Sequence, residues 1–363
     1  MSVLRSFTKL IPPPRYLMMP SVGVDISDTS LKYIQFQPDS HSGTALELSY
    51  WGDIDIPDSA LHRGTVNDVK ALSQAVGEVH ERTGMSTIRV SLPEERAYLF
   101  ETEIKKGTPF KEIRGLLEFR LEENVPLSPR DAFFDYDIIP DDLKTDTLRV
   151  SVTAYARETI TNYYEACVSA GMTPISFEVE AQAIARATIP KNDIGTHLIV
   201  DFGKTRTGIG IVYRGALMYT STIDIGGADL SGALRRQLGD KPESELTKIK
   251  NTQGLVRGVD GADVYDALLP TMSAIVDEIR TRMMYWNSRD LEASRQIQSI
   301  ILCGGSVNMK GLPEYFSEML GVEASRADVW GNAFSFNSHV PAIGRRYSYG
   351  YATAIGLGLT SFM

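Results

Sequence analysis

Two stretches of the sequence repeat one unusual pattern, and this duplication constrains the fold more than any other feature. In residues 22–35, VGVDISDTSLKYIQ, an apolar strand ends on Asp25, small hydroxyl residues follow, and a second strand begins at once. Residues 198–213, LIVDFGKTRTGIGIVY, repeat this order around Asp201. Turn formation alone does not require the same aspartate position twice. The repeat therefore predicts two homologous half-folds.

Each copy continues as three short strands and is followed by helices, which predicts two α/β lobes. One amphipathic helix ends at Gly84, and the apolar spacing over 272–286 predicts another. Between the copies the order differs: a strand over 86–104, a helix with Pro109 at its first position, two further strands and a last helix. We therefore predict an inserted α/β subdomain in the first lobe and a mainly helical insertion in the second.

These observations divide the chain into six predicted units. They are an N-terminal extension (1–20), a first-lobe core (21–95 and 176–190), an inserted subdomain (96–175), a second-lobe core (191–227 and 293–345), a helical insertion (228–292) and a C-terminal packing helix (346–363).

Composition excludes several classes of protein. A net charge of −9 over 363 residues argues against a broad nucleic-acid surface, so we expect no nucleic-acid partner. No apolar run is long enough to span a bilayer, and the two cysteines lack metal-ligand spacing, which fits a reducing cytoplasm. The first twenty residues combine basic and apolar side chains, so we expect packing on the protein itself or mobility, and at most peripheral membrane contact.

The two turns carry groups that suit a polyphosphate ligand. Facing each other, they would direct backbone N–H groups and hydroxyls into one cleft. Asp25 and Asp201 would then suit Mg²⁺ held mainly through water and phosphate oxygens, and Lys32 could reach a phosphate. The remaining candidates are Ser27, Asp28, Thr29, Ser30, Gly203, Lys204 and Thr205. The alternative is that these residues only form turns.

Three further elements are weaker candidates. Gly304 and Gly305 follow a predicted strand and would let the backbone lie close to a nucleotide, or simply form a strand-to-helix turn. Glu180 begins an alanine-rich helix, where it could position a water or only favour the helix dipole. Glu245 and Lys248 share a helical face and could hold ribose and base, although a surface ion pair is the default interpretation.

Taken together, these elements resemble the actin-like ATPase superfamily over residues 21–363. The runs SLPEERAYLFETEI and EIRGLLEFRLEENVPLSPRDAFFDYDII look specifically like the PilM family of type IV pilus assembly. The resemblance implies two duplicated ribonuclease-H-like lobes, an inserted subdomain of the kind that FtsA and PilM carry, and a nucleotide cleft between the lobes. It assigns Asp25 to Lys32 to a first phosphate motif and Asp201 to Thr207 to a second.

The resemblance also assigns roles to the remaining candidates. Glu180 takes the place of a water-positioning residue, and Glu245 with Lys248 the place of adenosine ligands. The other assigned residues are a glycine pair near the phosphates, Gly226 and Gly227, and an adenosine motif, Gly304, Gly305 and Ser306. ATP and Mg²⁺ are the implied cofactors.

The implied function is a cytoplasmic scaffold, recruited to the inner face of the cytoplasmic membrane by the N-terminal peptide of a PilN-like protein. The peptide groove is expected near helix 110–125 and strand 132–139. Pilus motor ATPases and self-association are further contacts that the resemblance leaves open. Asp28 beside phosphate is repulsive unless Lys204 or Arg206 offsets it, so we expect nucleotide binding with at most slow hydrolysis.

Two alternatives remain at the level of sequence. One is an FtsA-like cell-division filament protein, which the small-residue apolar segment at 351–363 disfavours because it predicts packing on a lobe. The other is a small-molecule kinase of the same fold, which would need a substrate-binding aspartate base that the sequence does not single out.

Overall fold

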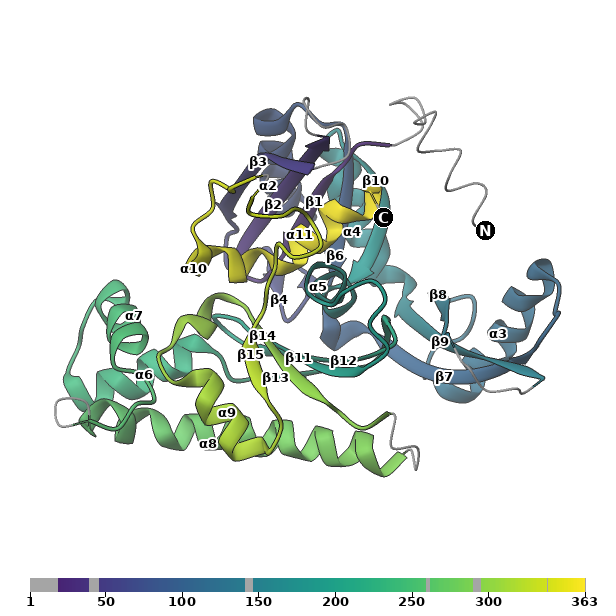
Figure 1. The fold of residues 1–363 in the computed structure, drawn as a ribbon. Coiled ribbons are helices and arrows are strands. Elements are labelled where there is room, and N and C mark those ends of the chain that lie inside the picture. Colours follow the sequence, from purple (N-terminus) through teal and green to yellow (C-terminus); the bar gives the residue numbers. More distant parts are fainter. Residues whose placement is uncertain are drawn as a thin grey trace.

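The computed structural model describes most of the chain and contains two five-stranded sheets with a smaller three-stranded sheet to one side (Figure 1). The described residues are 19–38, 46–140, 146–258, 262–289, 295–337 and 339–362. The amphipathic turn predicted within the first eleven residues lies outside them. None of the helices in the described part of the chain is both long and apolar enough to cross a membrane.

The two large sheets have the same internal order, which confirms the predicted duplication. In each, three antiparallel strands are followed by two that run parallel to the first. The upper sheet has the order β10-β6-β1-β2-β3, with strands β1 (Val22–Ile26), β2 (Ser30–Pro38), β3 (Leu46–Asp55), β6 (Thr87–Leu92) and β10 (Thr173–Val179). The lower sheet has the order β13-β12-β11-β14-β15, with strands β11 (Thr196–Phe202), β12 (Thr207–Tyr213), β13 (Ala216–Ile223), β14 (Ser299–Cys303) and β15 (Ala324–Arg326).

Two short helices form the layer between the sheets (Figure 1). Helix α11 (Ala352–Leu359) packs on β1 and β2, and α5 (Glu180–Thr188) packs on β12 and β13. The helices cross closely, because a Cβ atom at Gly356 would lie 1.7 Å from the carbonyl oxygen of Ala183. Every residue of α11 is buried, as its small apolar side chains predict.

The remaining helices cover the two lobes. Helices α2 (Val69–Thr83) and α4 (Arg157–Ser169) pack on each other and on the upper sheet. The long helix α8 (Ala262–Arg289) runs beneath the lower sheet, beside α9 (Leu312–Leu320) (Figure 1). Helices α6 (Gly227–Leu238) and α7 (Glu243–Thr252) lie at the end of the lower lobe, and the short α10 (Arg345–Ser348) precedes α11. The predicted second insertion is therefore helical.

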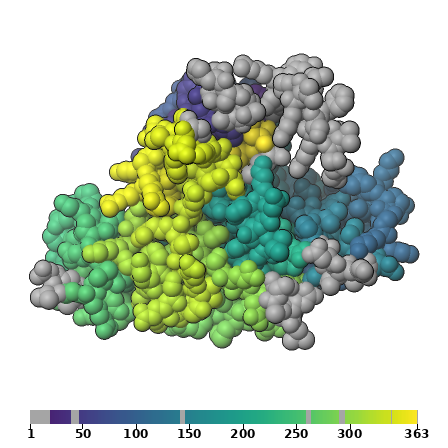
Figure 2. Space-filling view, in the orientation of Figure 1, coloured from purple at the N-terminus to yellow at the C-terminus, as the bar shows by residue number. Residues whose placement is uncertain are grey.

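The small sheet belongs to a subdomain with its own core, and it projects from the side of the two lobes as the blue part of Figure 2. Its order is β7-β9-β8, and Leu117 and Leu121 of its helix are fully buried. The elements are β7 (Tyr98–Lys105), α3 (Phe110–Asn124), β8 (Ala132–Ile138) and β9 (Thr147–Ala156). Helix α4, in contrast, buries Tyr163 and Cys167 in the main core shared with the first lobe.

Two details of the subdomain differ from the sequence analysis. The strand predicted over 86–104 is two strands in different sheets, since Pro93 has no N–H to continue the ladder and a short 3₁₀ turn follows at Glu94–Arg96. Pro109 lies just before helix α3 rather than at its first position, because its extended ψ of 135° is not helical.

Candidate functional site

A cavity of about 350 Å³ opens between the two lobes, where β1 ends in the upper sheet and β11 ends in the lower one. Both predicted turns contribute to it: Ser27, Thr29 and Ser30 of the first turn, and Gly203, Lys204 and Thr205 of the second. The other predicted residues that line this interlobe cavity are Asp25, Lys32, Glu180, Asp201, Gly304 and Gly305. The fold thus brings together four segments that are separate in the sequence.

The first turn (Ser27–Ser30) is held by its own hydroxyl groups. The Ser27 hydroxyl donates to the carbonyl of Ser30 at 2.9 Å and accepts from the Ser30 N–H at 3.3 Å. Lys32, paired with Asp25 across the two strands, donates from Nζ to the Ser30 hydroxyl at 2.8 Å. Ser91 at the end of β6 donates to Asp25 at 3.0 Å. Local hydrogen bonds therefore shape this turn and place a lysine beside its aspartate.

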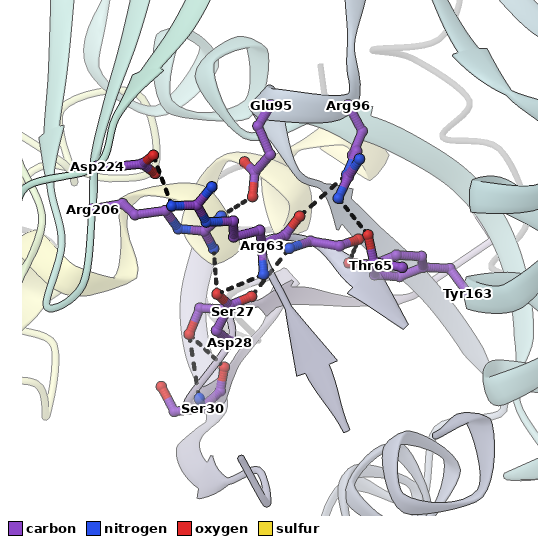
Figure 3. A network of polar contacts seen from close by, with 11 residues as sticks. Ser27, Asp28, Ser30, Arg63, Thr65, Glu95, Arg96, Tyr163, Arg206 and Asp224 are labelled. Atoms are coloured by element: carbon purple, nitrogen blue, oxygen red, sulfur yellow. Dashed lines mark hydrogen bonds and ion pairs between the residues drawn. The ribbon is translucent and has the colours of Figure 1, made fainter. Parts of the chain in front are cut away.

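Asp28 points away from the interlobe cavity and organises a neighbouring hairpin (Figure 3). Its carboxylate accepts the backbone N–H groups of Arg63 and Gly64 at 3.0 and 3.1 Å. Those two residues join β4 (Leu61–His62) to β5 (Thr65–Val66) and both have positive φ, the geometry of a tight two-residue hairpin loop. The same carboxylate pairs with Arg206 at 2.9 Å. The second carboxylate of the first turn is thus already neutralised by a cation.

The second turn (Gly203–Arg206) is held by hydrogen bonds from two other elements. The Gly203 carbonyl accepts the N–H of Gly227 at 3.0 Å and the Ser306 hydroxyl at 2.9 Å. A Cβ atom on Gly226 would lie 2.6 Å from backbone atoms of the turn, and one on Gly304 would lie 2.4 Å from the Asp201 carboxylate. These glycines are therefore required for close approach.

Not every predicted ligand lies on the cavity wall. Thr207 is fully buried and donates to the carbonyl of Ile225, so its role is structural. Gly226, Gly227 and Ser306 support the second turn from behind, and Asp28 faces the hairpin. Glu245 and Lys248 also lie outside the lining of the interlobe cavity, and Glu245 pairs with Lys241 on the surface.

A second, basic cavity lies beyond the Gly304–Gly305 element. Gly350 lines the interlobe cavity, and its neighbour Tyr349 lines this basic cavity of about 650 Å³. Cationic side chains outnumber the single carboxylate there. The lining includes Asn251, Asn308, Lys310, Glu314, Arg326, Arg345 and Arg346. Asn251 follows Lys248 by less than one helical turn, so the end of α7 faces this cavity.

Sequence reasoning missed several cavity residues, of which Glu94 and Glu95 matter most. They follow β6, which runs parallel to β1, so its carboxyl end lies at the same edge of the sheet. That rule could have found them, because ligands collect at the carboxyl ends of parallel strands. Glu94 is only 3% exposed. The other missed residues are Asp53, Asp55, Gly208, Thr222 and Gly350.

Burial, and after it an excess of carboxylates over cations, raises several pKa values in the interlobe cavity. Burial, then the charge of Asp25, raises the pKa of Asp201 to about 7. Burial, followed by the charge of Asp201, raises the pKa of Glu94 well above its ordinary value, and burial with the charge of Asp25 does the same for Glu180. A bound cation would offset this repulsion.

The donor set fits a metal that keeps water and phosphate as ligands. Among the described residues no cluster of three or more His, Cys, Asp or Glu side chains forms a ready metal cage. Asp25 and Asp201 lie on the wall of one cavity, beside hydroxyls and a lysine. Mg²⁺ is usually bound by one or two carboxylates together with substrate phosphates, so these residues fit a magnesium–phosphate complex.

A groove of about 500 Å³ separates the subdomain from the first lobe. Strands β8 and β10, each at the edge of its sheet, line the two sides. Phe133 and Phe177 give the groove an apolar surface, and the Arg157 guanidinium lies 4.0 Å from the centre of the Phe133 ring. Glu178 and Arg186 form an ion pair of 2.5 Å at its floor. The strand expected near a peptide site (132–139) lines this β8–β10 groove, whereas the helix expected beside it (110–125) contributes no residue to the lining.

Comparison with solved structures shows which known folds this chain resembles. The structure of a PilM-PilN type IV pilus biogenesis complex matches with a TM-score of 0.74 and 19% identity, over 95% of this chain and 99% of that chain. The ethanolamine utilization protein EutJ from Carboxydothermus hydrogenoformans matches with a TM-score of 0.53 and 16% identity, over 96% and 90%. MreB5 of Spiroplasma citri bound to ADP matches with a TM-score of 0.53 and 12% identity, over 93% and 94%. The predicted actin-like fold is confirmed.

A comparison with protein families covers nearly the whole chain. Residues 23–362 match the family described as type IV pilus assembly protein PilM. The match includes both turns, the inserted subdomain and the helix α11 between the lobes. The chain therefore belongs to the PilM family of type IV pilus assembly proteins.

Proposed function

We propose that this chain is an ATP-binding scaffold of type IV pilus assembly that works at the inner face of the cytoplasmic membrane. It holds Mg²⁺ and ATP between its two turns and binds the N-terminal peptide of a PilN-like membrane protein in the β8–β10 groove. The observation that carries the nucleotide half is the convergence of Asp25, Asp201 and both turns on one cavity. A duplicated turn that served only to reverse the chain would not need this convergence.

The cavities suggest how a nucleotide lies across the site. The interlobe cavity offers hydroxyls, N–H groups and two lysines for phosphates. The basic cavity, reached past Gly304 and Gly305, offers Asn251 and Asn308 for a base and ribose. A bound magnesium ion would neutralise phosphate charge beside Asp25 and Asp201. Glu180 lines the interlobe cavity, and its raised pKa favours the protonated carboxyl, which cannot accept a proton from an attacking water. We therefore expect slow hydrolysis.

The peptide half rests on the groove. An edge strand leaves backbone N–H and C=O groups free to pair with an extended peptide, and alternate side chains can enter pockets. Phe133, Phe134 and Phe177 line the groove among Asp135, Asp137 and Arg186. We therefore expect an extended peptide with apolar residues and at least one cation. The likeness to the PilM-PilN type IV pilus biogenesis complex supports a PilN-like partner.

The nucleotide half is tested by calorimetry with ATP, with and without Mg²⁺, on the wild type and on Asp25→Ala and Asp201→Ala. Circular dichroism checks that the variants fold. We expect metal-dependent binding that weakens at least tenfold in both variants. Intact protein that binds no nucleotide would show that the cavity is only a remnant of the fold.

The peptide half is tested by fluorescence anisotropy with a labelled N-terminal peptide of a PilN-like protein. Phe133→Asp should weaken binding at least tenfold, because it places a charge in an apolar contact. Phe119→Asp is the matched control, since Phe119 is 66% exposed on α3 and does not line the groove. Equal loss in both variants would contradict the groove assignment.

A further inference from the structure

The guanidinium of Arg206 joins the two lobes through carboxylates of the opposite lobe (Figure 3). Its Nη2 lies 2.9 Å from Asp28 of the first turn, and its Nη1 forms an ion pair with Glu95 after β6. All three side chains are largely shielded, with exposed fractions of 17%, 16% and 20%. The two turns are thus tied directly to each other by a cation from the second turn.

Arg206 stands at the boundary between two cavities. It lines the interlobe cavity together with Lys204 and Thr205, and it also lines a side cavity of about 390 Å³. Glu94, Glu95 and Thr222 line both cavities as well. The side cavity contains neither Gly304 nor Gly305, and the basic cavity does not contain Arg206. Arg206 therefore lies at the end of the interlobe cavity away from the expected base.

A polyphosphate that starts at the basic cavity brings its last phosphate closest to this end. The planar guanidinium binds a phosphate as well as a carboxylate, in a two-pronged geometry that lysine lacks. A terminal phosphate can therefore replace Asp28 or Glu95 as the partner of Arg206. A diphosphate is shorter by one phosphate and leaves the carboxylates in place.

Resting on the proposed nucleotide function, we propose that Arg206 makes the site selective for a nucleoside triphosphate over a diphosphate, by exchanging its carboxylate partners on the first lobe for the terminal phosphate. The exchange removes the ion pairs of Arg206 with Asp28 and Glu95, which join the two lobes. A bound triphosphate would therefore weaken the ion pairs between the lobes, whereas a bound diphosphate would leave them in place.

A second ion pair between the lobes provides a control. Arg63 of the first lobe lies 2.9 Å from Asp224 of the second, and both side chains are 58% exposed. This pair also bridges the lobes, as Figure 3 shows, but neither residue lines the interlobe cavity. Loss of a bridge as such is therefore separable from loss of a phosphate ligand.

The experiment titrates the full chain with magnesium ATP and magnesium ADP by calorimetry. In Arg206→Gln we expect ATP affinity to fall at least tenfold while ADP affinity changes less than threefold, since a charge-assisted contact is lost only with the triphosphate. In Arg63→Gln both affinities should stay within threefold of the wild type. Equal changes for ATP and ADP in Arg206→Gln would overturn the proposal.

A second variant changes a carboxylate that competes with the phosphate, and leaves Arg206 itself unchanged. In Glu95→Gln the guanidinium loses one charged partner, so ATP should bind several-fold more tightly and ADP should be unchanged. A merely structural role for the ion pair would not tighten binding, so unchanged or weaker ATP binding would overturn the exchange. If the wild type binds both nucleotides but the variants do not show these differences, only this inference is refuted. If the wild type binds neither nucleotide, the proposed function is refuted as well.

Discussion

The two turns occupy equivalent places in duplicated sheets, yet they are stabilised in different ways. The first turn is closed by the hydroxyl of Ser27 and by Lys32, whereas the second is supported by glycines from α6 and from the loop after β14. They also differ in charge, with Asp28 in the first and Arg206 in the second, and these residues meet across the cleft. The two copies thus keep the same position at the end of a strand, but their turns carry opposite charges that pair with each other.

The largest expected effect concerns Asp201, a half-buried aspartate near the end of β11. Burial and the charge of Asp25 raise the pKa of Asp201 from 3.8 to about 7. The neutral carboxyl is favoured in the folded protein, so its contribution to stability is fully present below pH 3.8 and is lost as the pH rises to about 7. Ionisation should cost about 3 kcal/mol, which is less than the full shift implies because the side chain is partly exposed.

Urea denaturation of the nucleotide-free protein between pH 4.5 and 8 measures this effect. Asp201→Asn should be more stable than the wild type at pH 8 and similar to it at pH 4.5. If the two proteins showed parallel pH dependence, Asp201 would not be the group responsible.

The glycine support of the second turn should be nearly as important. Gly226→Ala places a Cβ atom 2.6 Å from Arg206 N and Lys204 O, which are backbone atoms that cannot move away cheaply. We expect a loss of about 3 kcal/mol in the free energy of unfolding, the upper end for overpacking. Chemical denaturation measures it.

Gly232→Ala in the interior of α6 is the matched control for this substitution. Its nearest neighbour is the end of the Arg236 side chain at 3.8 Å, and alanine favours a helix. This variant should be slightly stabilised, and two equally destabilised variants would contradict the packing argument.

The first turn should tolerate the loss of its hydroxyl better. Ser27→Ala removes both hydrogen bonds between this hydroxyl and Ser30 but leaves the backbone bond from the Ser27 N–H to the Ser30 carbonyl at 2.9 Å. We expect about 1 kcal/mol of destabilisation in total, because the turn is only half-buried and water can replace part of what is lost. Thermal unfolding checks it, and a loss as large as that of Gly226→Ala would erase the contrast between the turns.

The smallest effect is expected at the exposed bridge between the lobes. Arg63→Gln removes the ion pair with Asp224, and both side chains are 58% exposed. Exposed ion pairs contribute little, so the free energy of unfolding should change by less than about 0.5 kcal/mol. A larger change in urea denaturation would show that this bridge, and not only that of Arg206, ties the lobes together.

Much of the site could be predicted because its residues follow strand ends in a repeated pattern. Asp25, Asp201 and the glycine pair after β14 needed only the rule that parallel strands present their carboxyl ends together. Glu94 and Glu95 obey the same rule, but the strand before them was extended through Pro93 and the strand end was missed. Glu245 and Lys248 were proposed from their shared helical face and from the resemblance, and the basic cavity is lined by Asn251 of the same helix.

The sequence by itself determined the two lobes, the inserted subdomain, the buried helix α11 and the identity of the turn residues, because hydrophobic period and turn chemistry are local properties. Only the tertiary structure decided which side chains face the cavity. Asp28 turned out to cap a hairpin, Arg206 and not Lys204 turned out to be the cation that pairs with it, and Thr207 turned out to be buried. Such outcomes depend on where two sheets come together, and contacts between segments so distant in the chain leave no pattern within either one.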